Sequence, residues 1–167
     1  MAATFTFAAQ HVLEDAGRAF RAVQRRHPDA TADAAWVALE EIDHATLIEL
    51  HAILLGSDRD EIAARLSGTS CIVNYHKDIS GALCAAGHAV GLFLAYREAE
   101  DVAFVYGVAL AMARRRTRLS PALKYFGIQQ CVRAGIRDVR FQIMDGAMDT
   151  VAYVRRLHRP AKQRDRS

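Results

Sequence analysis

Residues 89–110, AVGLFLAYREAEDVAFVYGVAL, decide the fold class of this chain of 167 residues. Two apolar runs, 89–96 and 102–110, are rich in residues that favour strands, and the charged segment 97–101 joins them. Apolar runs of this length with a short polar connection predict a β-hairpin whose strands are buried. The sequence therefore predicts a protein built around a sheet and not a helical bundle.

The chain after this hairpin alternates helix and strand. Ser120 and Pro121 follow a basic loop and predict a helix start, with Ser120 as the cap and Pro121 in the first turn. Gly135 predicts the end of that helix. Two further elements are expected from their apolar spacing, a strand over 138–144 and a helix over 149–157. This order predicts an α/β fold in which helices flank a mixed sheet.

The first third of the chain reads mainly as helical. Its apolar spacing predicts a short strand over 4–7 and a second strand over 70–76. Between them it predicts three helices, over 12–27, 33–55 and 58–66. Pro28 is expected to end the first helix, Thr31 or Asp33 to cap the second, and Gly56 to end it. We expect a single domain over 1–167, with a mainly helical N-terminal segment over 1–69, a sheet core over 70–158 and a disordered polar tail over 159–167.

Composition and charge restrict the classes of function. The sequence has no long apolar run and no signal-peptide pattern, so we expect a cytoplasmic protein without a membrane partner. Residues 1–100 carry 8 Lys and Arg against 14 Asp and Glu, whereas residues 101–167 carry 14 against 5. A phosphate-rich cofactor, a nucleic acid, or docking of the two halves on each other would each balance this asymmetry.

Cysteine and histidine spacing argues against a metal or a disulfide framework. Cys71, Cys84 and Cys131 are odd in number and widely separated, and no CxxC pair occurs. Glu41 and His44 have the spacing of helical metal ligands, but a carboxylate-bridged site needs a second such segment. We therefore expect no metal.

Residues 90–157, VGLFLAYREAEDVAFVYGVALAMARRRTRLSPALKYFGIQQCVRAGIRDVRFQIMDGAMDTVAYVRRL, resemble the core of the GNAT superfamily of acyl-CoA N-acyltransferases. In that family a strand hairpin leads into an Arg/Gln-x-x-Gly-x-Gly/Ala loop, and a helix, a further strand and a short helix bearing a Tyr follow. The resemblance implies a GNAT-like fold, acetyl-CoA or another acyl-CoA as co-substrate, and an amine of a small molecule or protein as acceptor.

The resemblance also implies which residues would hold the cofactor. The family's first Arg falls at Arg115 and its small final residue at Ser120, while Arg118 stands where the family has Gly. Gly permits close approach of a phosphate and a positive φ, so Arg118 either grips a phosphate or fills the groove; a basic loop in solvent is the alternative. The implied cofactor-binding residues are Val108, Leu110, Arg115, Arg116, Arg118, Leu119 and Ser120.

Two tyrosines are the catalytic candidates. The family places a Tyr near the leaving thiol, and the matching residue is Tyr153, although Gly146 and Asp149 depart from the Asn and Ala of that pattern. A phenol can protonate a departing thiolate. Tyr106 lies on the strand before the motif and is the candidate base, whereas packing of either ring on the sheet is the alternative.

Three hypotheses follow from these residues. The first is an N-acyltransferase that moves an acyl group from acyl-CoA to an amine. The second is a catalytically inactive binding or regulatory protein with a GNAT-like fold, and the third is a nucleic-acid or partner-binding protein, for which no known binding module is present. The strand that follows the Tyr helix in the family is missing, so we expect an open sheet edge that a second copy of the chain could cover.

Overall fold

The protein is built on one six-stranded sheet. The computed structural model describes residues 3–56, 58–67, 76–111, 118–143 and 148–158. The strand order is β1-β6-β5-β4-β3-β2. The strands are β1 Ala3–Ala8, β2 Ala35–Ala38, β3 Gly81–Ala85, β4 His88–Ala99, β5 Val102–Leu110 and β6 Asp138–Ile143. The mixed sheet flanked by helices confirms the predicted fold class.

The hairpin predicted over 89–110 is present and forms the centre of the sheet. β4 and β5 pair antiparallel from Gly91 opposite Leu110 to Ala99 opposite Val102. Residues 92–95 of β4 are buried, as expected for a strand with helices on both faces.

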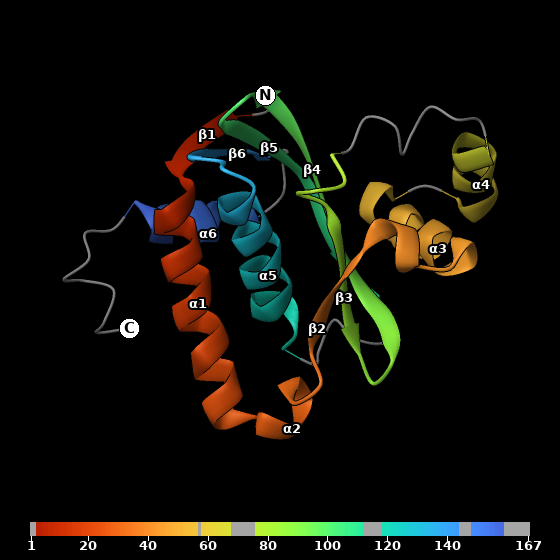
Figure 1. Ribbon diagram of the computed structural model, residues 1–167, viewed down its shortest axis with the longest axis horizontal. Helices are drawn as coiled ribbons and strands as arrows, with labels where there is room; N and C mark the ends of the chain where they lie inside the picture. The colour runs from red at the N-terminus through yellow and green to blue at the C-terminus, as the bar shows by residue number, and fades with distance from the viewer. Residues whose placement is uncertain (1–2, 57, 68–75, 112–117, 144–147, 159–167) are drawn as a thin grey trace.

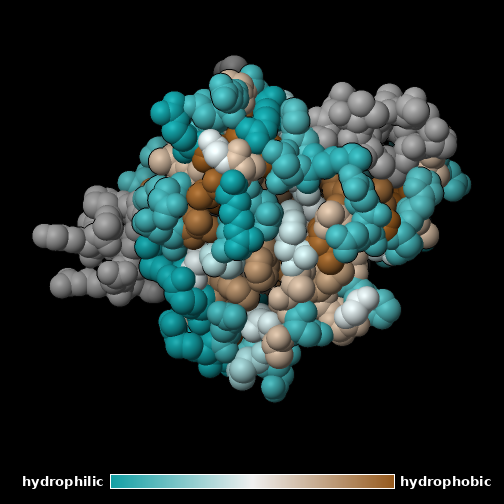
Figure 2. Space-filling model, in the orientation of Figure 1, coloured by the Kyte–Doolittle hydropathy of each residue, from teal (hydrophilic) through white to brown (hydrophobic). Residues whose placement is uncertain are grey.

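Helices cover both faces of this sheet. They are α1 Ala9–Arg26, α2 Pro28–Thr31, α3 His44–Leu55, α4 Arg59–Ser67, α5 Ser120–Arg133 and α6 Met148–Leu157. α1 and α5 lie side by side on one face, and α3 and α4 lie on the opposite side (Figure 1). α1 is amphipathic: Val12, Ala16 and Phe20 are buried, while its outer surface is hydrophilic (Figure 2).

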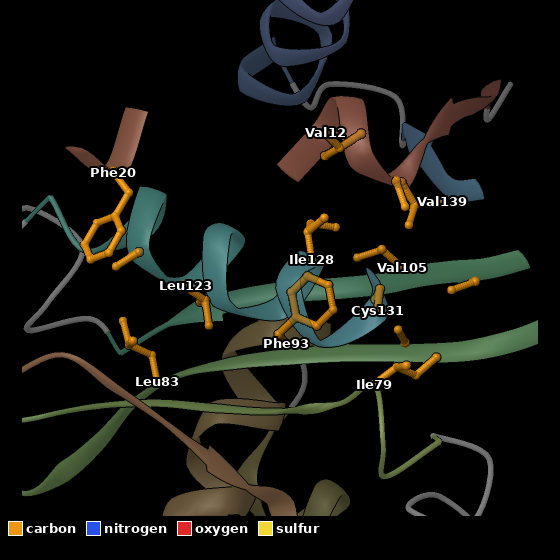
Figure 3. Close-up of a cluster of buried hydrophobic side chains, with 14 of the residues drawn as sticks. Val12, Phe20, Ile79, Leu83, Phe93, Val105, Leu123, Ile128, Cys131 and Val139 are labelled. Carbon is orange, nitrogen blue, oxygen red and sulfur yellow. The ribbon is translucent and has the colours of Figure 1, made fainter. Parts of the chain in front are cut away.

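The main core lies between α5 and the sheet. Phe93 points from β4 toward Ile128 and Cys131 of α5 (Figure 3). A Cβ atom added to Gly127 would lie 2.3 Å from the Phe93 ring, so α5 approaches β4 as closely as it does because residue 127 is glycine. A smaller cluster on the other face joins α3 to β4 through Leu50, Leu92 and Leu94.

The predicted helix over 33–55 is wrong in its first half. Ala35–Ala38 is strand β2, a 3-10 turn follows at Leu39–Glu41, and α3 begins only at His44. Two contacts explain the difference. The Trp36 ring covers Gly81 of the neighbouring strand β3, and Asp43 caps α3 by accepting a hydrogen bond from the Thr46 amide at 2.9 Å.

The predicted C-terminal ends of α3 and α5 are confirmed, whereas the predicted cap of α5 is wrong. Gly56 ends α3 with a left-handed φ of 64°, and Gly135 follows α5 with φ 83°, as predicted. Ser120 is the first residue of α5 and not its cap, since the cap position is Leu119. The strand predicted over 70–76 lies outside the described residues except for His76.

The edge of β6 is not open, which corrects the prediction made from the missing last strand. β1, from the opposite end of the chain, pairs antiparallel with β6 from Ala3 opposite Ile143 to Ala8 opposite Asp138. The sequence did predict a strand at 4–7, but its partner could not be read from spacing alone. Among the described residues, no helix has the length and apolar character needed to cross a membrane.

Candidate functional site

β5 and β6 separate halfway along β5, and this is the feature that makes a site. The two strands pair in parallel only from Val102 opposite Asp138 to Val105 opposite Phe141, although β5 runs on to Leu110. Beyond that point the helix α5 crosses over the opening, since Ser120 and Lys124 face the same space as Gln142 at the end of β6.

A β-bulge begins where the pairing stops. Leu94 of β4 lies opposite Gly107 and the next residue, Ala95, lies opposite Val105, so Tyr106 is an extra residue in β5. A bulge bends its strand, increases its twist and is frequent beside active sites. The bend explains why β5 leaves β6 at this residue.

Gly107 allows the bent strand to pass beneath α3. A Cβ atom at residue 107 would lie 2.4 Å from a methyl carbon of Leu54. A glycine inside an apolar strand is the sequence pattern that marks a bulge or a close approach. That pattern is present in residues 102–110, so the sequence carries a signal for the bulge.

A pocket of about 310 Å³ fills the gap between the separated strands. Small-molecule sites have volumes of about 300 Å³ and upward. Its walls combine apolar and polar surface, with polar groups toward the start of α5 and the end of β6. The lining residues are Phe93, Val105, Tyr106, Gly107, Val108, Ser120, Lys124, Ile128, Phe141 and Gln142.

The start of α5 forms one end of this pocket. Ser120, Lys124 and Ile128 line it at a spacing of four residues, which is one face of the helix. The cap residue Leu119 has no polar side-chain atom, so it cannot accept the first amide hydrogens of α5. Unpaired amides and the positive end of the helix dipole make such a helix start suitable for an anion.

Arg118 has the backbone conformation of a glycine. Its φ is 62°, in the left-handed region that a side chain makes costly and that glycine adopts freely. The guanidinium group of Arg118 is directed to Nε2 of His27, just beyond the end of α1. Arg118 is therefore not one of the residues that line the pocket.

The structure brings some of the sequence-predicted residues together and leaves others apart. Tyr106, Val108 and Ser120 line the pocket, whereas Leu119 is 1% exposed in the core and Leu110 packs against that core. Tyr153 belongs to α6, and its side chain lies outside the described residues, as do Arg115 and Arg116. The sequence interpretation missed seven of the lining residues: Phe93, Val105, Gly107, Lys124, Ile128, Phe141 and Gln142.

Comparison with known proteins identifies the architecture. No protein-family model matches the sequence, and no curated protein matches it. A GNAT family acetyltransferase from Elizabethkingia anophelis with acetyl-CoA bound matches the structure with a TM-score of 0.51 and 8% identity, over 73% of this chain and 71% of that one. AAC(6')-Iy in complex with the bisubstrate analogue CoA-S-monomethyl-acetylneamine matches with a TM-score of 0.54 and 14% identity, over 77% of this chain and 90% of that one.

A third solved structure agrees with these two. The aminoglycoside antibiotic 6'-N-acetyltransferase AAC(6')-IG from Acinetobacter haemolyticus has a TM-score of 0.51 and 15% identity, over 77% of this chain and 90% of that one. The chain has the GNAT fold. The expected fold is therefore confirmed, whereas the low identities leave the activity to be argued from the site itself.

The charged residues near this GNAT fold's hairpin turn are engaged in ion pairs. Arg140 of β6 donates to Glu98 at 2.6 Å, and Arg137 pairs with Asp101. These carboxylates flank the start of β5, whereas the pocket lies beyond Val105. Two arginines of the basic half, Arg140 and Arg156, thus pair with acidic residues of the first half, so docking of the halves accounts for some of the charge asymmetry.

The cysteines described in this GNAT fold are poor nucleophiles at neutral pH. Burial raises the pKa of the Cys131 thiol to about 12. Burial and, to a lesser extent, the charge of Glu41 raise the pKa of Cys84. Both thiols are free, and neither lines the pocket. Neither of these two thiols therefore supplies a nucleophile to the pocket.

Proposed function

We propose that the protein is an N-acyltransferase that moves an acetyl or other acyl group from CoA to an amine acceptor. One observation carries the proposal: the pocket between β5 and β6 ends against the start of α5, whose cap residue Leu119 makes no side-chain hydrogen bond to the helix. An acyl-CoA has a long, uncharged arm next to a pyrophosphate, and this site offers a slot of mixed polarity next to a helix start of the kind that suits an anion.

Two of the cofactor roles implied by the GNAT resemblance, those of Val108 and Ser120, fit this arrangement. Val108 and its neighbours in β5 are not paired with β6 in the described strands, so their backbone groups on that side can meet the pantetheine arm. Ser120 begins the helix whose amides would face the pyrophosphate. Arg115 and Arg116 remain candidates for phosphate contacts, while Arg118 leaves the groove through its contact with His27.

The reaction can be written with the groups at hand. The amine nitrogen attacks the thioester carbonyl carbon, an N–C bond forms and the C–S bond breaks, leaving an amide and a CoA thiolate. Backbone amides near the Tyr106 bulge would stabilise the negative oxygen of the tetrahedral intermediate. Tyr153 would give its phenolic proton to the thiolate, and Tyr106, which is 45% exposed, would pass the amine proton to water.

The activities of two structural neighbours support an amine as the acceptor. AAC(6')-IG is an aminoglycoside 6'-N-acetyltransferase, and AAC(6')-Iy was captured with an analogue that joins CoA to acetylneamine. We propose a cytoplasmic enzyme that acts on an amine of a small molecule or protein.

A catalytically inactive binding protein is the second candidate. Gly146 and Asp149 depart from the pattern around the family's Tyr, and this departure affects catalysis without affecting the pocket. Such a protein would bind acetyl-CoA and release no thiol with any amine.

Calorimetric titration of acetyl-CoA into the full chain tests the proposal. We expect one site with a Kd of about 1 μM to 1 mM, the usual range for enzyme substrates. Thiol release from acetyl-CoA in the presence of an aminoglycoside, a polyamine or a lysine peptide then separates enzyme from binding protein. Absence of binding heat, confirmed by absence of protection against thermal unfolding, would reject both candidates.

A further inference from the structure

The position of α6 depends on the opposite end of the chain. α6 follows β6, and its buried residues Val154 and Leu157 join the same core cluster as Val12 of α1. Apolar contacts of this kind hold a helix against a core, but they are non-directional and leave its rotation about its own axis weakly defined. Polar contacts with α1 and ring packing against β1 restrict that rotation.

The strongest of these contacts is an ion pair to a buried carboxylate. Asp15 of α1 is 5% exposed, and its Oδ2 accepts a hydrogen bond from a terminal guanidinium nitrogen of Arg156 at 2.9 Å. Arg18 contributes a second, longer contact to Oδ1 at 3.6 Å. A carboxylate that is nearly out of solvent requires a charged partner, because an unpaired buried charge is strongly unfavourable.

Two further contacts close the same end of α6. The His11 ring lies with Nε2 3.1 Å from the carbonyl oxygen of Leu157, the last residue of α6. The His158 ring packs on Phe7 of β1, with ring centroids 4.9 Å apart. β1 and α1 therefore hold both the edge of β6 and the end of the helix that carries Tyr153.

We infer that Asp15 is a positioning residue for Tyr153, acting through Arg156. Tyr153 precedes Arg156 by three residues in α6, so a rotation of the helix about its axis moves both positions together. A helix whose rotation is held at Arg156 is therefore held at Tyr153. The inference rests on the proposed function, because it is the leaving thiolate that gives Tyr153 its task.

The alternative role for Asp15 is structural stability without any effect on the site. A purely structural ion pair would change the free energy of unfolding and leave turnover unchanged per folded molecule. A positioning pair would lower kcat and leave the Kd for CoA unchanged, since the pocket is lined by β4, β5, β6 and α5 and by no residue of α1 among those described.

The experiment uses the full chain labelled with 3-fluorotyrosine and observed by fluorine NMR. Tyr153→Phe assigns the Tyr153 resonance, and Asp15→Asn is compared with Glu14→Gln, the preceding residue on α1. We expect Asp15→Asn to shift or broaden the Tyr153 resonance and to lower kcat for thiol release about ten- to hundredfold, with an unchanged Kd for CoA. Glu14→Gln should change none of these, and Asp15→Glu should restore some of the lost kcat.

A second variant removes the risk that Asp15→Asn does not fold. Asp15→Leu combined with Arg156→Met leaves no buried charge and no polar group that could re-form the pair, so it should fold and show the same loss in kcat. A Tyr153 resonance and a kcat equal to those of the wild type in both variants would overturn the inference. Failure of the wild type to bind CoA would reject the proposed function instead, while the Tyr153 resonance would still report whether Asp15 orients α6.

Discussion

The two sides of β5 differ, and the difference explains where the site is. On one side β5 is bonded to β4 from Val102 to Leu110, whereas on the other it is bonded to β6 only as far as Val105. The half that is bonded on both sides, here called the closed half, belongs to a packed core. The half that is bonded only to β4, here called the open half, is the wall of a pocket. One extra residue, Tyr106, separates the two, so a local backbone feature and not a separate domain creates the site.

The largest effect is expected from overpacking the core between α5 and β4, where Phe93 lies opposite Val108 of β5. Gly127→Ala would press a methyl group into the Phe93 ring at a starting distance of 2.3 Å. We expect a loss of about 2–3 kcal/mol in the free energy of unfolding, because a fully buried ring has little room to move. Urea denaturation followed by circular dichroism measures it.

Gly17→Ala is the matched control for this prediction. Gly17 also lies inside a helix, but a Cβ atom there would meet only the flexible end of Arg21 at 3.1 Å and the edge of Tyr125 at 3.4 Å. The higher helix propensity of Ala should then dominate and stabilise the protein by up to about 1 kcal/mol. Equal effects of the two substitutions would show that α5 and β4 are not packed as described.

An intermediate effect is expected where β5 bends beneath α3. Gly107→Ala should cost about 1–2 kcal/mol, because the new methyl group displaces Leu54. Combining it with Leu54→Ala should recover some of that cost, because the obstructing methyl groups are then gone. A double-mutant cycle with no coupling between the two positions would contradict the close approach.

A smaller effect is expected at Arg118, where strain and contact oppose each other. Arg118→Gly should be more stable than Arg118→Ala by about 1 kcal/mol, because only glycine adopts φ 62° without steric cost. Both variants lose the contact with His27, so their difference isolates the backbone. Equal stability of Arg118→Ala and Arg118→Gly would contradict the left-handed conformation of residue 118. Ala86, in the turn between β3 and β4, also has a positive φ of 52°, so Ala86→Gly should raise the free energy of unfolding by a similar amount.

The elements of the fold that could be predicted from the sequence are those set by local pattern. The hairpin over 89–110 and the end of α5 at Gly135 depend on residues close in sequence, and both are confirmed. Strand β2 was mistaken for helix because Trp36 and Val37 are extended only through their pairing with β3, which lies far along the chain. For the same reason spacing alone did not reveal that β1 pairs with β6.

The candidate site was predicted only in outline. Val108 and Ser120 were named from the GNAT resemblance and line the pocket, but Lys124 and Gln142 were not, because no motif marks them. Their place in the pocket follows from the separation of β5 and β6, which is a tertiary feature. The Gly of the family motif did point to a left-handed backbone at Arg118, but the contact of its side chain with His27 could not be read from the sequence.

A buried histidine of α3 should make the stability of the protein depend on pH. His51 of α3 is 2% exposed, and burial lowers its pKa from the ordinary 6.5. The unfolded chain therefore binds a proton more readily than the folded one. The free energy of unfolding should accordingly be higher above pH 6.5 and should decrease as the pH falls below 6.5. His51→Gln should flatten this dependence in urea denaturation, while His44→Gln, exposed on the same helix, should leave it unchanged.

The most direct test of the central claim is the affinity for acetyl-CoA after the open half of β5 is blocked. Val108 and Val102 are both half-buried valines of β5, but only Val108 lines the pocket. By calorimetry, Val108→Trp should weaken acetyl-CoA binding by about a hundredfold or more, and Val102→Trp should leave the Kd within about twofold of the wild type. Equal affinities for the two variants would contradict the placement of the acyl-CoA site between β5 and β6.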